Sequence, residues 1–487
     1  MTNLAKLTIT DAIKGLKNKE FTSIELTEAC IDNSKKNKNL NIFITETFNK
    51  AIEMAKKSDE KIAQGKGGKI EGIPLGIKDL FCTKDIRTTS ASKMLENFIP
   101  PYESTVTKKL QNEGYVMIGK TNMDEFACGS TTTTSYFGAA VNPYKKKGDD
   151  RDLIPGGSSG GSSAGVASNC FLGATGTDTG GSIRQPSALC NLVGSKPTYG
   201  RASRYGIVAY ASSFDQAGML TKTVKDNALL TEIICGFDKK DSTSSIKKVP
   251  NFSELLNSDV KGKKIGIVKE FMNIDKVHLE IYQALDNAIR VLKSKGAEIK
   301  EISLPNVKHT ASLYTILSYT ELASNLARYD GVRYTHRSDK ELLSLDELYS
   351  KSRTEGFCEN IKKRILLGYH MSSSENYDKY FLHAQKVRRI IVEDFKKVFN
   401  EVDAILTPTS PNVAFPIKMT EEEKKMDLAS NYLNDLFTIP VNLTGLPAMS
   451  VPAGFSKDGL PMGLQVITNY FDEQQMFDIG LVLEEIK

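Results

Sequence analysis

The chain has 487 residues, of which 40% are hydrophobic and 25% charged, a composition typical of a globular protein with ample apolar material for a core. Its 64 basic and 59 acidic side chains leave a formal net charge of +5, which is too slight a bias to predict nucleic-acid binding by itself. No apolar run approaches the roughly 18 residues of a membrane span, and the N-terminus lacks the pattern of a signal peptide, so we expect neither a membrane protein nor export.

The first part of the chain has helical spacing. Apolar residues recur at helical intervals over 8–64, and Thr22 with Glu25 forms a capping-box pattern at the start of one of these helices. Residues 1–65 are therefore expected to form a helical N-terminal layer.

Short apolar runs then alternate with segments of helical spacing. The runs are IPLGI, YVMIG, KKIGIVK, DAILTP, AMSVPAGF and GLQVI, and the clearest intervening helix is predicted over 278–295. Strands that alternate with helices indicate an α/β sheet fold. Length alone does not settle whether the sheet belongs to one domain or to more.

A segment rich in glycine and serine lies in the middle of the chain, at 155–184. Two Gly-Gly-Ser elements end at Ser158 and Ser182, which are 24 positions apart, enough for a turn, a helix over 162–171 and a returning strand. This path would bring both hydroxyls to one end of the sheet. Buried-type residues interrupt the segment, so it reads as a site made of backbone amides and hydroxyls and not as a flexible linker.

A hydroxyl nucleophile needs a proton acceptor, and histidine, the usual one, is scarce here. The five histidines all lie beyond residue 270, mostly in lysine-rich or helical contexts typical of the surface. Lys78 stands alone in the apolar run IPLGIKDLF. It could be a strand lysine that reaches solvent, but if burial lowers its pKa towards neutrality it can act as the base.

Four other readings of the chain carry less support. Gly157 to Gly161 satisfies GxSxG with Ser159 as nucleophile, but no histidine lies in a fitting motif for an α/β-hydrolase. A nucleotide-binding loop would need GxxxxGK[ST] or a strand–turn–helix with a later acid, and neither pattern is present. Metal-ligand spacings such as HExxH are missing, so no metal is expected. RNA binding would need a basic stripe with stacking aromatics, and the lysines at 145–147 read instead as a solvated loop.

Long motifs in the chain resemble the amidase signature family. The motifs are PGGSSGGSSAG, GTDTGGSIRQPSALCNLVGSKPTYGR and the upstream IPLGIKDL. TNMDEFACGS, ASSFDQAG, NLARYDGVRY, KKRILLGYH and NDLFTIPVNLTGLPAMSVPAGF resemble the tRNA-amidotransferase branch of that family. The resemblance covers nearly the whole chain. It implies a single α/β domain over 1–487 with a mixed central β-sheet covered by helices on both faces, a catalytic core at 66–230, and the rest of the sheet and the substrate-recognition segments at 231–487.

The resemblance also implies a Ser–cisSer–Lys triad. It places the nucleophile at Ser182, the proton relay at Ser158, which would follow a cis peptide bond, and the base at Lys78. The oxyanion hole would be formed by the backbone N–H groups of Thr179, Gly180, Gly181 and Ser182, where consecutive glycines let amides converge on a developing charge.

In the glutamine-using branch, a guanidinium binds the carboxylate of the substrate and a carboxylate binds its ammonium. The resemblance carries these roles to Arg364 and Asp435, which taken alone would read as a helix-surface arginine and a helix cap or exposed acid. Tyr210 matches an aromatic position of the family's pocket, although a core tyrosine would look the same. Tyr314 is a further candidate contact, with Thr315 beside it where a second aromatic is expected.

The expected reaction is hydrolysis of the side-chain amide of glutamine through an ester on Ser182, with ammonia as the useful product. By resemblance, the ammonia passes to a kinase/transamidase subunit that converts Glu-tRNA(Gln) or Asp-tRNA(Asn) with ATP and Mg²⁺, while a third, small subunit clasps the two in a heterotrimer. This chain itself should need no cofactor and should meet tRNA mainly through its partner. Scattered cysteines without CxxC spacing favour a cytoplasmic location. The rival interpretation is a stand-alone amidase acting on another carboxamide.

Overall fold

The computed structural model of the chain describes residues 3–272, 274, 277–340, 344–420, 423 and 434–485. Within these residues eleven strands form one mixed sheet in the order β1-β3-β2-β4-β6-β5-β10-β11-β9-β7-β8. The strands are β1 (Phe43–Glu46), β2 (Pro74–Lys78), β3 (Val116–Thr121), β4 (Gly173–Thr177), β5 (Val193–Lys196), β6 (Ala217–Thr221), β7 (Lys264–Val268), β8 (Glu298–Ile302), β9 (Ala404–Pro408), β10 (Ala448–Phe455) and β11 (Pro461–Thr468). The six apolar runs of the sequence all contribute strands of this sheet.

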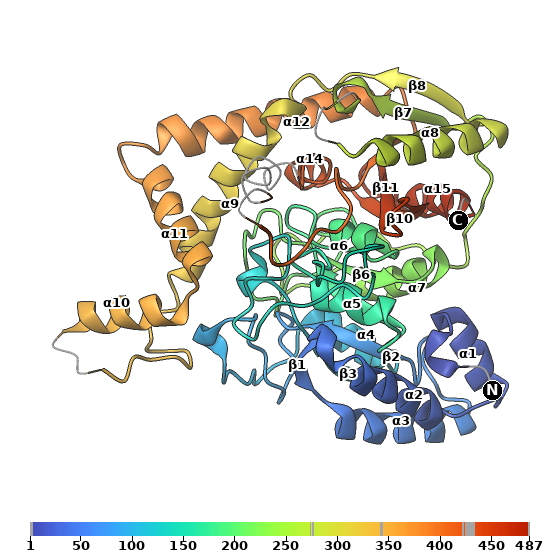
Figure 1. The fold of residues 1–487 in the computed structure, drawn as a ribbon, viewed down its shortest axis with the longest axis horizontal. Coiled ribbons are helices and arrows are strands. Elements are labelled where there is room, and N and C mark those ends of the chain that lie inside the picture. Colours follow the sequence, from blue (N-terminus) through green and yellow to red (C-terminus); the bar gives the residue numbers. More distant parts are fainter. Residues whose placement is uncertain are drawn as a thin grey trace.

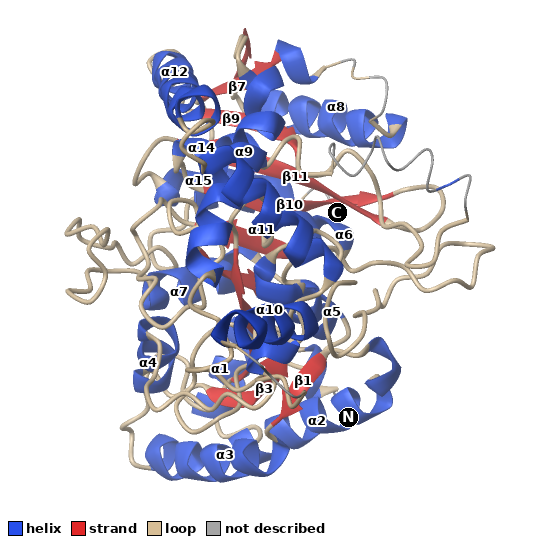
Figure 2. Cartoon of the chain, turned by 90° about the vertical axis from the view of Figure 1, so that its left-hand side faces the viewer, coloured by secondary structure: helices blue, strands red, loops and turns tan. Residues whose placement is uncertain are grey.

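The sheet runs through the middle of the molecule, with helices on either side of it (Figures 1 and 2). The α-helices are α1 (Ile9–Lys17), α2 (Ser23–Lys36), α3 (Phe48–Ala63), α4 (Thr105–Asn112), α5 (Gly160–Ala167), α6 (Arg184–Leu189), α7 (Val224–Ile234), α8 (Leu279–Ser294), α9 (Thr310–Leu326), α10 (Leu345–Gly356), α11 (Glu359–Ser372), α12 (His383–Val398), α14 (Ile439–Thr444) and α15 (Glu473–Glu484). The predicted α/β class, with a mixed sheet covered on both faces, is confirmed.

Burial explains the apolar runs. Every residue of β2, β3 and β4 is buried, as expected for strands whose two faces are both covered by other elements. Helices α1 and α2 of the N-terminal layer have side-chain caps. Thr22 and Glu25 form the predicted capping box of α2, with the Thr22 N–H donating to Glu25 Oε2 at 2.7 Å. The helix predicted over 278–295 is α8.

Two predicted boundaries differ from the structure. The segment 1–65 is not purely helical, because it also contains β1, which pairs antiparallel with β3 at the edge of the sheet. This strand has only four residues, too few for a clear alternating pattern. The helix predicted over 162–171 is α5, which begins two residues earlier, at Gly160, and ends at Ala167, so that the chain re-enters the sheet at Gly173.

The topology places the glycine-rich segment at the carboxyl ends of β2 and β4. β2 pairs parallel with β4, so the carboxyl ends of both strands, Lys78 and Thr177, lie at the same edge. The turn that carries Ser158 precedes α5, and the turn that carries Ser182 follows β4 and leads into α6. None of the helices in the described ranges is both long and apolar enough to span a membrane.

Candidate active site

Lys78 ends β2 and is fully buried. Its Nζ lies 2.8 Å from Ser158 Oγ, 2.8 Å from Ser159 Oγ and 2.9 Å from Thr177 Oγ1. The interpretation of Lys78 as a strand lysine that reaches solvent is therefore wrong. Its amine is held among three hydroxyl groups inside the protein.

Burial lowers the pKa of Lys78 from 10.5 to about 7. Three carboxylates oppose this effect, because attraction to Asp124, Asp178 and Asp215 favours the charged amine. Desolvation outweighs them, since none of the three forms an ion pair with Lys78 in the described structure. Near neutral pH a large fraction of the amine can accept a proton from an adjacent hydroxyl.

Gln185 joins the two loops that carry Ser158 and Ser182. Its side-chain oxygen accepts a hydrogen bond from the Gly157 N–H at 3.0 Å, and its own backbone N–H donates to the Gly181 carbonyl at 2.8 Å. The peptide bond between Gly157 and Ser158 is cis, as the family resemblance implied. The two serines predicted as relay and nucleophile thus stand on neighbouring loops linked through one residue.

The turn at Thr179–Ser182 borders the cleft through Gly180 and Ser182. No residue of the described ranges accepts a hydrogen bond from the N–H groups of these four residues. Gly181 has φ +144°, a conformation that L side chains rarely adopt, and a methyl group there would lie 2.3 Å from Thr438 Oγ1. This arrangement can hold an oxyanion, which is the role predicted for the turn.

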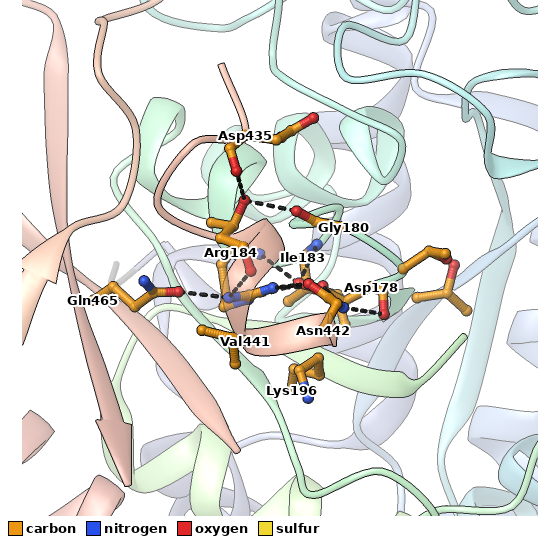
Figure 3. A network of polar contacts seen from close by, with 12 residues as sticks. Asp178, Gly180, Ile183, Arg184, Lys196, Asp435, Val441, Asn442 and Gln465 are labelled. Carbon is orange, nitrogen blue, oxygen red and sulfur yellow. Dashed lines mark hydrogen bonds and ion pairs between the residues drawn. The ribbon is translucent and has the colours of Figure 1, made fainter. Parts of the chain in front are cut away.

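A buried ion pair holds the turn from behind (Figure 3). Arg184 and Asp178 are fully buried, and Arg184 Nη2 lies 2.8 Å from Asp178 Oδ1. The Arg184 guanidinium also donates to Asn442 Oδ1 at 2.6 Å and to Gln465 Oε1 at 2.5 Å. Asn442 in turn donates to the Asp178 carbonyl at 3.1 Å. These contacts fasten the catalytic turn to α14 and β11, elements more than 250 positions later in the chain.

A cleft of about 480 Å³ opens in front of this turn. Ser182, Gly180, Tyr210, Tyr314, Arg364 and Asp435 all line it. The structure therefore brings the predicted nucleophile and all four predicted substrate contacts to one cavity. Lys78 and Ser158 lie deeper, beneath the cavity wall.

Arg364 comes from α11 and is half-buried. Its Nε donates to Asn360 Oδ1 at 3.2 Å and its Nη1 donates to Cys128 Sγ at 3.0 Å, while its Cζ lies 4.9 Å from the centre of the Tyr319 ring. It does not project from an exposed helix surface, which was the alternative interpretation.

Asp435 precedes α14, and its Oδ1 would lie 3.2 Å from a methyl group at Gly181. The carboxylate is therefore beside the predicted oxyanion turn and is not an exposed acid. Desolvation, together with the nearby Asp178, raises the pKa of Asp435 from 3.8 to about 7. Arg184 and Arg364 oppose this shift.

The two predicted tyrosines differ in their surroundings. Tyr210 is 3% exposed and its hydroxyl donates to Ser318 Oγ at 3.2 Å, so it belongs to the core and to the cleft wall at once. Tyr314, on α9, covers Gly180: a methyl group there would lie 2.8 Å from the Tyr314 hydroxyl oxygen. Thr315 also lines the cleft, where a second aromatic was expected.

The competing readings gain no support from the geometry. Ser159 Oγ donates to the Thr177 carbonyl at 3.3 Å and accepts a hydrogen bond from Lys78 Nζ. No histidine lines the cleft in the described ranges. Groups of three or more histidine, cysteine or acidic residues suited to a metal do not occur in the part of the chain that the structure describes. All seven cysteines are free thiols.

The sequence analysis missed the residues that support the site. Thr177, Asp178, Arg184 and Gln185 all lie within the GTDTGGSIRQP motif, so their position was a usable signal. Cys128 lies in the quoted TNMDEFACGS motif, where it read as one scattered cysteine. Nothing in the sequence paired it with a residue 236 positions later.

Comparisons with known proteins agree with this geometry. The family model described as Amidase matches residues 25–477. The chain is 50% identical over 485 residues to the A subunit of the Glutamyl-tRNA(Gln) amidotransferase of Parvibaculum lavamentivorans, covering 100% of this chain and 97% of that protein. The crystal structure of the same-named protein from Thermotoga maritima has a TM-score of 0.80 and 37% identity, covering 100% of this chain and 96% of the other. The native peptide amidase of Stenotrophomonas maltophilia has a TM-score of 0.82 at 25% identity, covering 99% and 96%.

Proposed function

The chain belongs to the amidase family, and we propose that it is the glutamine-hydrolysing component of a tRNA-dependent amidotransferase. The observation that carries the proposal is the joining of two parts in one cleft. The predicted nucleophile, Ser182, lines the cleft together with a guanidinium and a carboxylate, those of Arg364 and Asp435. A simple carboxamide has no use for the second pair, whereas the amino-acid head of glutamine has one charge for each.

In the reaction we propose, neutral Lys78 accepts the proton of Ser158 and Ser158 accepts that of Ser182. The Ser182 oxygen attacks the side-chain amide carbon of glutamine, and the negative charge that develops on the amide oxygen is stabilised by the N–H groups of the Thr179–Ser182 turn. The relay then returns the proton to the leaving nitrogen, so that ammonia departs and a glutamyl ester remains on Ser182. Water, deprotonated by the same relay, hydrolyses the ester to glutamate.

Ser158 can relay the proton because its hydroxyl donates and accepts at once. The Nζ–Oγ distance of 2.8 Å is that of a direct hydrogen bond. Ser159 and Thr177 accept the two N–H bonds of the neutral amine, which directs its remaining lone pair to Ser158.

The ammonia would be used by a partner. We propose that this cytoplasmic chain works in a heterotrimer with a kinase/transamidase subunit, which would hold ATP, Mg²⁺ and most of the bound tRNA, and a small clasping subunit. The products would be Gln-tRNA(Gln), Asn-tRNA(Asn) or both. The 50% identity over the full length to a chain named as part of an amidotransferase, against 25% to a peptide amidase, favours this role over that of a stand-alone amidase.

The test is a glutaminase assay of the chain alone and with its two partner subunits, in the presence and absence of misacylated tRNA and ATP. Glutamine hydrolysis that rises when partners and tRNA are added is the expected result. Hydrolysis of unrelated carboxamides at higher kcat/KM than glutamine, indifferent to the partners, would identify a stand-alone amidase instead.

A further inference from the structure

Among the described residues, the groups in direct contact with the Arg364 guanidinium are uncharged. Its two hydrogen-bond partners are an amide oxygen, on Asn360, and a thiol sulfur, on Cys128, and a tyrosine ring lies beside it. No carboxylate lies within ion-pair distance of Arg364 among the residues that the structure describes. Its positive charge is held in place without being neutralised.

Asn360 lies one helical turn before Arg364 on α11, on the same side of the helix. Its Oδ1 accepts from Arg364 Nε, while its Nδ2 donates to the Cys128 carbonyl at 3.0 Å. Both ends of the amide are used, and the second bond fixes which end faces the arginine, because only the NH₂ group can donate to a carbonyl.

The amide therefore bridges two separate parts of the cleft wall. One is α11, which carries Arg364, and the other is the loop at 127–130, of which Ala127, Gly129 and Ser130 line the cleft. Cys128 adds a second tie between the same parts through its sulfur. The Nη2 atom of Arg364 has no protein partner in the described ranges, so its N–H groups are available to a ligand in the cleft.

We propose that Asn360 and Cys128 are positioning residues that orient Arg364 towards the α-carboxylate of the substrate. Neither of them neutralises the charge of the guanidinium. An acid at either place would compete with the substrate for the guanidinium; an amide and a thiol hold it without competing. The inference rests on the proposed function, since it presumes that the ligand of Arg364 is the carboxylate of glutamine.

Four related amides separate the head-group contacts. Glutamine has both charges, glutaramate has only the carboxylate, 4-aminobutanamide has only the ammonium, and butanamide has neither. A residue that acts through Arg364 should affect the first two substrates and spare the last two. A residue that merely supports the fold should affect all four.

The variants are assayed in the full chain assembled with its partner subunits. Asn360→Ala should raise KM about ten-fold for glutamine and glutaramate with little change in kcat, because one hydrogen bond to a charged group is lost. Asn360→Asp should raise it at least as much, since the new carboxylate pairs with the guanidinium. Cys128→Ser keeps an acceptor and should stay within about three-fold of the parent. Lys363→Ala, an exposed position on α11, is the matched control and should change nothing.

Equal losses on all four substrates in Asn360→Ala, or unchanged KM for glutamine in both Asn360 variants, would overturn the proposal. If Asn360→Ala fails to fold in a thermal melt, the isosteric Asn360→Asp decides the question alone. A parent enzyme that hydrolyses butanamide as well as glutamine would overturn the proposed function itself. A parent that prefers glutamine, with Asn360 variants that keep this preference, would overturn only the positioning role.

Discussion

The Nζ atom of Lys78 lies 2.8 Å from Ser158 Oγ at a point where neither side chain has access to solvent. A lysine amine in such a place is poised between its two protonation states, because burial has brought its pKa down to about 7. We propose the amine itself as the base of this site, so its charge state should set the pH dependence of the reaction.

The first prediction concerns that charge. Because the pKa of Lys78 is lowered, the amine is neutral above about pH 7 and protonated below it. We expect kcat/KM for an uncharged amide to fall about ten-fold per pH unit on the acid side of this value. Lys78→Arg should be as inactive as Lys78→Ala, since a guanidinium stays protonated at any workable pH. Substantial turnover by the arginine variant would show that another group is the base.

The second prediction concerns the nucleophile. Ser182→Ala should abolish the glutamyl ester, which acid quenching and mass spectrometry of the parent enzyme should detect on the peptide that contains Ser182. The side chain is 7% exposed at the cleft floor, and removal of one hydroxyl there should change the free energy of unfolding by no more than about 1 kcal/mol. Ser168→Ala is the control: its hydroxyl donates to the Ala164 carbonyl at the end of α5 and does not line the cleft, so this variant should still form the ester. An ester formed by Ser182→Ala would falsify the assignment.

The third prediction concerns the head group of glutamine. Arg364→Ala and Asp435→Ala should each lower kcat/KM for glutamine. The loss should correspond to about 2–5 kcal/mol of transition-state stabilisation, because a substrate charge then lies unmatched in a partly desolvated cleft. Butanamide never makes these contacts, so its slow hydrolysis should survive both changes. Equal loss on both substrates would mean that the two residues support the fold or the triad.

The fourth prediction separates the two groups that titrate near pH 7. The pKa of Asp435 is raised, so its carboxyl loses its charge as the pH falls below about 7 and can no longer pair with an ammonium group. The ratio of kcat/KM for glutamine to that for butanamide should therefore fall on the acid side, since protonation of Lys78 affects both substrates alike. In Asp435→Asn the ratio should be low and independent of pH; a ratio that still varies with pH in this variant would assign the titration elsewhere.

The fifth prediction concerns the oxyanion turn. Gly181→Ala should reduce kcat about 100-fold or more, because the added methyl would meet Thr438 Oγ1 at 2.3 Å and displace the amides of the turn. Gly65→Ala is the matched control: Gly65 also has a positive φ, of +67°, but no atom lies within 4 Å of an added methyl. Comparable activity losses in the two variants would point to a general effect on folding.

The two serines of the site could be predicted from the sequence, because the signals that mark them are local. Ser158 and Ser182 lie 24 residues apart, in segments whose glycines and flanking apolar runs define the turns. Lys78 could be identified because a charged residue inside a buried strand is rare. The helices could also be predicted from local signals, as the capping box of Thr22 and Glu25 illustrates.

The contacts that hold the cleft wall and the Thr179–Ser182 turn in place could not be predicted in the same way, because they join distant segments. The ties from Arg364 to Cys128 and from Arg184 to Asn442 span 236 and 258 positions. Propensity and periodicity describe neighbours along the chain and are silent on such pairs. The order of the sheet has the same origin: β5 lies beside β10, although their paired residues Lys196 and Ala448 are far apart in the sequence.

The network around Asp178 and Arg184 also makes the turn depend on segments that are synthesised much later. Asn442 and Gln465 complete the shell of that ion pair, and they follow Arg184 by 258 and 281 positions in the chain. A polypeptide that stops before α14 already contains Lys78, Ser158 and Ser182, yet it leaves the buried arginine with Asp178 but without its two amide partners, and the turn without that support. We therefore expect such a truncated chain to carry all three triad residues and to release no ammonia from glutamine.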